Sequence, residues 1–146
     1  MARLTSIHNF VINVADDLPR VSADPDKLYQ VLLNLVVNAI KYSPDGGPIT
    51  VTAIERDGGM RFEVADQGVG ISAEHLPYVF ERFYRAARGK GGVTGTGLGL
   101  FVSKSLVEQM GGTIRAESEV GQGSRFFFDL PLAPAEEAEA EDKIAS

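Results

Sequence analysis

Alternating apolar and polar side chains predict that strands make up much of this chain. Residues 49–56 and 60–66 alternate with a period of two on either side of the sequence DGG, which is the pattern of a β-hairpin. Residues 113–119 and 124–132 alternate in the same way around the sequence VGQG. The chain is therefore expected to contain two hairpins.

A helical period of about 3.6 residues replaces this alternation between Asp24 and the breaker-rich sequence SPDGGP. Asp24 is a good N-cap and Pro25 suits the first helical position. Four apolar side chains fall on one narrow arc of this helix and are expected to face a core: Leu28, Leu32, Leu35 and Ala39.

The remaining apolar runs predict smaller elements. Short strands are expected at 10–14 and 21–23, a short helix at 72–83, and a helix at 98–110 that ends at two glycines. Hairpins dominate, so the predicted fold class is α+β. We expect a two-layer α/β sandwich with a mixed, mostly antiparallel sheet and helices on one face.

Composition narrows this picture to one domain. The chain has 146 residues, 44% of them hydrophobic, no cysteine and no apolar run long enough to cross a membrane. Five of its 20 acidic residues lie in the last 13 positions, so the rest is nearly neutral, which argues against nucleic-acid binding. We expect a cytoplasmic domain at 1–132 and an acidic, disordered tail at 133–146.

The predicted helix at 24–43 also carries a polar stripe. Gln30, Asn34, Asn38 and Lys41 are spaced four, four and three residues apart and so share one face. The stripe could simply face solvent. Alternatively, amide oxygens suit a hard ion such as Mg²⁺, and the lysine would supply a point charge to phosphates.

Two glycine-rich segments follow. Asp66 ends a predicted strand and begins the sequence DQGVG, which by itself could be a simple turn. The sequence GGVTGTGLGL then leads into the helix at 98–110, with spacing that fits neither a P-loop nor a dinucleotide-binding fingerprint. The sequence thus combines an asparagine-bearing helix, D-x-G-x-G after a strand and a glycine-rich loop before a helix, in that order. This combination is more specific than any one of its elements.

Five short motifs in this order resemble the catalytic ATP-binding domain of sensor histidine kinases. That family lies in the superfamily that also contains gyrase, heat-shock chaperone and mismatch-repair ATPases. The motifs resemble its N box (NLVVNAIKYS), first glycine box (DQGVGI), F box (FERFYR), second glycine box (GTGLGL) and third glycine box (GQGSRFFFDLP). The resemblance runs from about residue 24 to residue 131.

The resemblance implies a phosphate and metal site. Asn38 would be the Mg²⁺ ligand, Asn34 would lie near the phosphates, and Lys41 and Arg85 would contact them; these four are the expected catalytic residues. A mobile lid would wrap the phosphates through Gly95, Thr96, Gly97, Leu98, Gly99 and Leu100. The implied cofactors are ATP and Mg²⁺.

The resemblance also implies an adenine site. Asp66 would accept a hydrogen bond from the adenine amino group, Tyr42 would line the base, and the Ser124 hydroxyl would help to hold it, where the family usually has threonine. Gly68 and Gly70 would leave room for the base and let the chain turn. The chemistry agrees independently, because a carboxylate accepts from an exocyclic amine and guanine has a carbonyl at that position.

Transfer of phosphate to another protein fits these residues better than hydrolysis. The related hydrolases place a glutamate base one helical turn before the metal asparagine, whereas Asn34 cannot take a proton. The family's acceptor is a histidine on a separate dimerisation domain, which hands phosphate on to a response regulator. This domain alone is expected to be a monomer that binds ATP without phosphorylating itself. Two alternatives stay open: an anti-sigma-factor-type serine kinase, and a nucleotide-responsive binding module without turnover.

Other side chains have simpler interpretations. His8 lacks the acid that follows the family's acceptor and lies in a strand-like segment, so we expect it to be a surface histidine. Tyr78, Phe80, Phe83 and Tyr84 either pack beneath the lid or form an apolar patch that docks on the histidine-bearing helices.

Overall fold

The computed structural model describes residues 7–14, 21, 23–81 and 99–133. Its elements in chain order are β1 (His8–Val14), α1 (Pro25–Tyr42), β2 (Gly47–Arg56), β3 (Gly59–Asp66), the 3₁₀ turn η2 (Leu76–Tyr78), α2 (Gly99–Gln109), β4 (Thr113–Glu119) and β5 (Gly123–Pro131). Arg85, Gly95, Thr96, Gly97, Leu98 and the predicted acidic tail from residue 134 onward lie outside the described residues.

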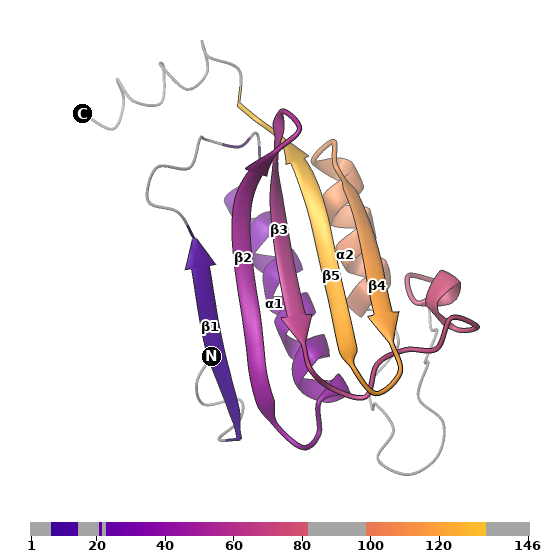
Figure 1. The fold of residues 1–146 in the computed structure, drawn as a ribbon. Helices are drawn as coiled ribbons and strands as arrows, with labels where there is room; N and C mark the ends of the chain where they lie inside the picture. The colour runs from indigo at the N-terminus through magenta and orange to yellow at the C-terminus, as the bar shows by residue number, and fades with distance from the viewer. Residues whose placement is uncertain (1–6, 15–20, 22, 82–98, 134–146) are drawn as a thin grey trace.

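The strands form one five-stranded sheet in the order β1-β2-β3-β5-β4. β1 runs parallel to β2, and the three other pairings are antiparallel. Both helices lie on one face of the sheet (Figure 1). The predicted α+β sandwich with a mixed, mostly antiparallel sheet is therefore confirmed.

The long helix begins and ends where the sequence indicates. The Asp24 carboxylate accepts hydrogen bonds from the backbone N–H groups of Asp26 (2.9 Å) and Lys27 (3.3 Å), which otherwise have no partner within the helix. Beyond the C-cap Ser43, Gly46 has a φ of 86°, a left-handed conformation that glycine adopts readily.

The core lies between the helices and the sheet. It contains side chains from α1, β2, β3 and β5, and among the largest that are fully buried are Leu35, Ile49, Val64, Phe126 and Phe128. Burying each such side chain contributes roughly 1.5–3 kcal/mol relative to leaving it exposed. The helix is rotated slightly from the expected arc: Val31, Leu35, Val36 and Ala39 are buried, while Leu28 and Leu32 are only partly so.

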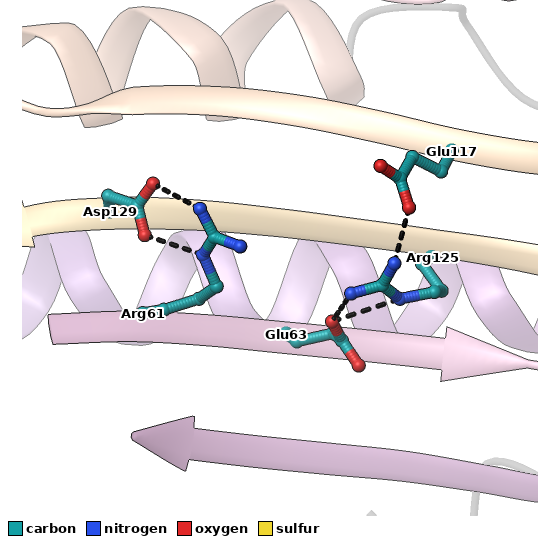
Figure 2. A network of polar contacts seen from close by, with 5 residues as sticks. All are labelled: Arg61, Glu63, Glu117, Arg125 and Asp129. Atoms are coloured by element: carbon teal, nitrogen blue, oxygen red, sulfur yellow. Dashed lines mark hydrogen bonds and ion pairs between the residues drawn. The ribbon is translucent and has the colours of Figure 1, made fainter. Parts of the chain in front are cut away.

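The other face of the sheet has neither of the described helices over it and carries a network of charged side chains. Arg61 on β3 forms a two-point ion pair with Asp129 on β5, at 2.8 and 2.9 Å. The guanidinium groups of Arg61 and Arg125 lie over the Phe127 ring, 4.6 Å and 5.2 Å from its centroid. Figure 2 shows the network, which comprises Arg61, Glu63, Glu117, Arg125 and Asp129.

Two sequence-based expectations need correction. The predicted strand at 21–23 is only an isolated bridge between Val21 and Leu132, because so short a run cannot continue a ladder. In place of the predicted helix at 72–83, the described part up to residue 81 contains only the three-residue turn at 76–78. Pro77 lies within that turn and lacks the N–H that a longer helix would use.

The helix predicted at 98–110 is observed at Gly99–Gln109, and it ends before Gly111, whose φ is 81°. Among the described residues, no helix has both the length and the apolarity to cross a membrane.

Candidate functional site

Predicted site residues from distant parts of the sequence meet at one end of the sheet. Asp66 at the end of β3 pairs with Ser124 near the start of β5, and Ser124 pairs with Ser118 on β4. The C-terminal end of α1 reaches the same end, since Val69 donates a backbone hydrogen bond to the Tyr42 carbonyl at 2.9 Å. Sheet register and helix length together assemble this site.

The two oxygens of the buried Asp66 carboxylate differ in their hydrogen bonding to the described residues. Its side chain is 6% exposed, and Oδ1 accepts a hydrogen bond from the Gly68 N–H at 2.9 Å. Oδ2 is buried and has no hydrogen-bond partner among the described residues. Burial raises the pKa of the Asp66 carboxyl, and the nearby backbone N–H groups of Gly68 and Ser124, together with His8, oppose this only in part. A buried acceptor left unpaired is costly, so this oxygen is suited to a donor from a ligand.

Ser124 adds a second buried oxygen beside Asp66. It is 2% exposed, and its Oγ lies 2.7 Å from Oγ of Ser118. Sequence reasoning missed Ser118. The available signal was the register of the second hairpin, because counting outward from its turn places Ser118 opposite Ser124.

The two glycines after Asp66 are required by the chain's own backbone. A Cβ on Gly68 would lie 2.0 Å from the Tyr42 carbonyl oxygen, and one on Gly70 would lie 2.2 Å from the Glu119 carbonyl oxygen. Gly70 also has a φ of 77°. Its expected role in turning the chain fits this conformation, whereas room for a base stays a prediction.

The two asparagines of the polar stripe on α1 differ in their hydrogen bonds to the described residues. Asn34 accepts from Gln30 Nε2 at 2.9 Å and donates to Ser103 Oγ and the Gly99 carbonyl on α2, at 3.3 and 3.4 Å. The Nδ2 of Asn38, one turn later, is buried without a hydrogen-bond partner among the described residues. Asn34 thus links the helices, while the Asn38 amide is not held in this way.

The remaining predicted residues lie at the C-terminal end of α1 and at the start of α2. Lys41 is exposed in the last turn of α1, and Tyr42 is buried in the core at its end. Gly99 is the first residue of α2, and its carbonyl accepts the Ser103 hydroxyl at 2.9 Å. Leu100 packs against the core. The structure therefore brings the Asn34 face of α1 to the N-terminal end of α2.

His8 and the aromatic residues differ in part from expectation. His8 is half-buried rather than on the surface, because its Nε2 donates to the Ser43 carbonyl at 2.6 Å. Phe80 packs edge-on against Phe126, with ring centroids 6.0 Å apart, while Tyr78 is 53% exposed. Phe83 and Tyr84 lie outside the described residues.

A cavity of about 310 Å³ lies at the opposite end of the sheet, around the β2–β3 turn and the start of β4. It is lined by arginine side chains and glycine backbone and shares no residue with the predicted site. The chemistry expected from the sequence is concentrated at the Asp66 end.

The fold and the site define a two-layer α+β domain that places buried acceptors at one end of its sheet, beside an amide-bearing helix. Residues 23–134 match the family of histidine kinase-, DNA gyrase B- and HSP90-like ATPases, and the chain belongs to this family.

Relatives within the family are sensor kinases. The chain is 45% identical over 117 residues to the sensor histidine kinase ZraS of Escherichia coli K12, a match that covers 80% of this chain and 24% of ZraS. It is 42% identical over 123 residues to the adaptive-response sensory kinase SasA of Synechococcus elongatus, covering 84% of this chain and 32% of SasA. The chain is thus homologous to sensor kinases and spans a minor part of their length.

Solved structures agree with this assignment. The mycobacterial sensor histidine kinase MprB superposes with a TM-score of 0.78 at 33% identity, covering 91% of this chain and 89% of that one. The catalytic domain of histidine kinase ThkA gives 0.75 at 30% identity, covering 91% and 85%. Full-length ShkA in complex with AMPPNP gives 0.73 at 37% identity, covering 87% and 26%. The region matched is the catalytic domain of a histidine kinase.

Proposed function

We propose that this domain binds Mg-ATP and donates the γ-phosphoryl group to a histidine on a separate dimerisation domain in two-component signal transduction. The observation that carries this proposal is the buried, unpartnered Oδ2 of Asp66 beside the buried hydroxyl of Ser124. The likeness to full-length ShkA, which was solved with AMPPNP, supports a nucleotide as the ligand.

Adenine recognition rests on Asp66. Its unpaired oxygen accepts a hydrogen bond from the C6 amino group of the base, which replaces the water lost on burial. Guanine presents a carbonyl there, and two facing acceptors repel each other, so the site selects ATP over GTP. Tyr42, Gly68 and Gly70 complete the wall of this site in the proposal.

Phosphate binding rests on the last two turns of α1. Asn38 is the proposed Mg²⁺ ligand because an amide oxygen suits a hard cation. Lys41 is exposed at the helix end and supplies positive charge to the phosphates. Mg²⁺, when bound, neutralises charge on the phosphate oxygens. Arg85 and residues Gly95–Leu100 are the further proposed phosphate contacts.

Transfer to a protein is favoured over hydrolysis by the position of Asn34. A neutral amide cannot accept a proton from water, and this amide is already engaged with Gln30 and Ser103. The proposed partners are the histidine-bearing dimerisation domain and, downstream, a response regulator, in the cytoplasm. The domain alone is proposed to be a monomer that does not phosphorylate itself.

Binding is tested first, with a fluorescent ATP analogue titrated against the domain with and without Mg²⁺. We expect saturable binding that Mg²⁺ strengthens in the parent protein and not in an Asn38→Ala variant. Saturation without any Mg²⁺ effect would remove Asn38 from the metal site, and no saturation would overturn the proposed function.

Transfer is tested next, by mixing the domain with γ-labelled ATP, Mg²⁺ and a histidine-bearing dimerisation domain from a sensor histidine kinase. We expect acid-labile label on the added domain, as for phosphohistidine. Acid-stable label on a partner protein would instead indicate the serine kinase, and binding without any transfer would indicate the nucleotide-responsive module.

A further inference from the structure

A row of three polar side chains crosses the sheet at the candidate site. Asp66 on β3, Ser124 on β5 and Ser118 on β4 are successive register partners, so their side chains lie on the same face. Asp66 and Ser124 carry proposed roles in adenine recognition. Ser118 carries none.

Ser118 makes three hydrogen bonds through a single hydroxyl. Its oxygen accepts from the backbone N–H of Ile71 at 2.6 Å, and its proton is directed to the Gly123 carbonyl at 3.0 Å. The third contact is the 2.7 Å approach to Oγ of Ser124.

The number of protons fixes the direction of the third bond. A serine hydroxyl has one proton and two lone pairs. Because a carbonyl can only accept, the Ser118 hydroxyl donates its proton to the Gly123 carbonyl, and the Ile71 N–H occupies one lone pair of the Ser118 oxygen. The second lone pair then receives the Ser124 proton. Ser124 therefore donates toward Ser118 and is left with only lone pairs for any other partner.

We infer that Ser118 is a positioning residue that makes the Ser124 hydroxyl an acceptor and so strengthens selection of a base with an amino group at C6. This rests on the proposed nucleotide binding at Asp66. With Ser118 in place, Asp66 Oδ2 and Ser124 Oγ both offer lone pairs, directly or to a bridging water, and both favour a donor. A base with a C6 carbonyl meets two acceptors and no free donor.

Removing the Ser118 hydroxyl frees the Ser124 proton. That proton loses its acceptor and can turn toward the ligand, where it can donate to a C6 carbonyl. The same substitution removes the acceptor of the Ile71 backbone N–H, which would weaken the binding of every nucleotide equally. The discriminating quantity is therefore the ratio of affinities for two bases, not the affinity for one.

The experiment measures dissociation constants for ADP and for inosine diphosphate, which carries a C6 carbonyl in place of the amino group. We expect Ser118→Ala to lower the preference for ADP by about three- to tenfold, the effect of one hydrogen bond. Ser118→Thr keeps the hydroxyl and should keep the parent's preference. Thr113→Ala removes a hydroxyl at the other end of β4 and serves as the matched control.

A double-mutant cycle tests whether the effect passes through Ser124. In a Ser124→Ala background, Ser118→Ala should leave the ratio unchanged, because no hydroxyl remains to be oriented. An unchanged ratio in the single Ser118→Ala variant, whether or not both affinities fall, would overturn the inference. Should that variant fail to fold, Ser118→Cys gives the same comparison, since a thiol is a weak acceptor.

Failure of the proposed function looks different. A parent protein that binds neither diphosphate would refute nucleotide binding itself. A parent that binds ADP, with a Ser118→Ala variant of unchanged preference, would refute only the role of Ser118.

Discussion

Carboxylate side chains on the open face of the sheet and at the sheet end near Asp66 differ in whether their oxygens have partners. On the open face each carboxylate of the network has a guanidinium partner: Asp129 binds Arg61, while Glu63 and Glu117 bind Arg125 (Figure 2). Hydrogen bonding to Asp129 and to Glu63, respectively, raises the pKa of both guanidinium groups. At the sheet end the carboxylate of Asp66 is more deeply buried, yet one of its oxygens has no partner among the described residues.

This difference in pairing distinguishes charged groups that stabilise the fold from a group that is suited to bind a ligand. The charged groups of the network pair with one another, and its two arginines lie over Phe127. A buried acceptor without a hydrogen-bond partner at the sheet end lowers the stability of the fold. Such groups are typical of functional sites, where a ligand can supply the missing donor. Substitutions at the two places should therefore affect different measurements.

The largest expected effect is on binding, from Asp66→Asn. The variant keeps the Oδ1 acceptor for Gly68 but loses the charge that accepts the adenine amine, which is worth about 1.5–3 kcal/mol, or roughly 10- to 100-fold in affinity. Its melting temperature should stay the same or rise, because a neutral amide avoids the desolvation of a buried charge. Titration with a fluorescent ATP analogue and a thermal melt measure the two quantities. Parent-like affinity would show that Asp66 does not bind the base.

The next effect is a pH dependence specific to Asp66. Burial raises the pKa of this carboxyl, and only its ionised form offers two acceptors. As pH falls from neutral through the raised pKa, the affinity for an ATP analogue should fall by up to about tenfold per pH unit.

The stability of the unliganded domain should move in the opposite direction. The folded state holds this proton more tightly than the unfolded state, so stability falls as pH rises from the unfolded pKa through the folded one. Asp66→Asn, measured over the same pH series by titration and denaturant unfolding, should flatten both contributions. Identical profiles for parent and variant would assign the titration to another group.

A smaller effect, on stability alone, is expected from Arg61→Ala. The variant loses the two-point pair with Asp129 and the contact with the Phe127 ring, together worth about 1–2 kcal/mol on a partly exposed face. Denaturant unfolding measures the loss, while affinity for the ATP analogue should stay within about twofold. A large loss of binding would mean that the two regions are coupled.

The smallest effect is expected from Glu117→Gln, which sharpens the comparison within the network itself. Glu117 is the more exposed of the two carboxylates that contact Arg125, and Glu63 still pairs with this arginine after the change. Unfolding free energy should fall by no more than about 0.5 kcal/mol. A loss of unfolding free energy greater than that of Arg61→Ala would show that the exposed Glu117–Arg125 pair contributes most of the stability of the network.

Much of the architecture could be predicted because its signals are local. The N-cap at Asp24, the breaker sequence after α1 and the two hairpin turns each act within a few residues, and the observed bounds follow them closely. The strand expected at 21–23 and the helix expected at 72–83 were wrong because short apolar runs depend on what they pack against.

The site was predictable in its residue types but not in its contacts. Family-like motifs pointed to Asp66, Asn38 and Ser124, and the fold brings Asp66 and Ser124 together. The motifs did not indicate that Gly68 is needed because of the Tyr42 carbonyl, or that the Ser118 hydroxyl contacts that of Ser124. These contacts join residues that are distant along the chain or separated by a turn whose register had to be known.

By itself, the sequence determined the two α-helices, the two hairpins and the family, because capping, periodicity and motif order are properties of neighbouring residues. Only the tertiary structure decided which polar atoms are satisfied. Within the part of the chain that the structure describes, Asn34 bonds across to α2, while the buried Nδ2 of Asn38 and Oδ2 of Asp66 have no partner. Hydrogen bonding over a few ångströms depends on how strands and helices pack, and packing is set by the whole core at once.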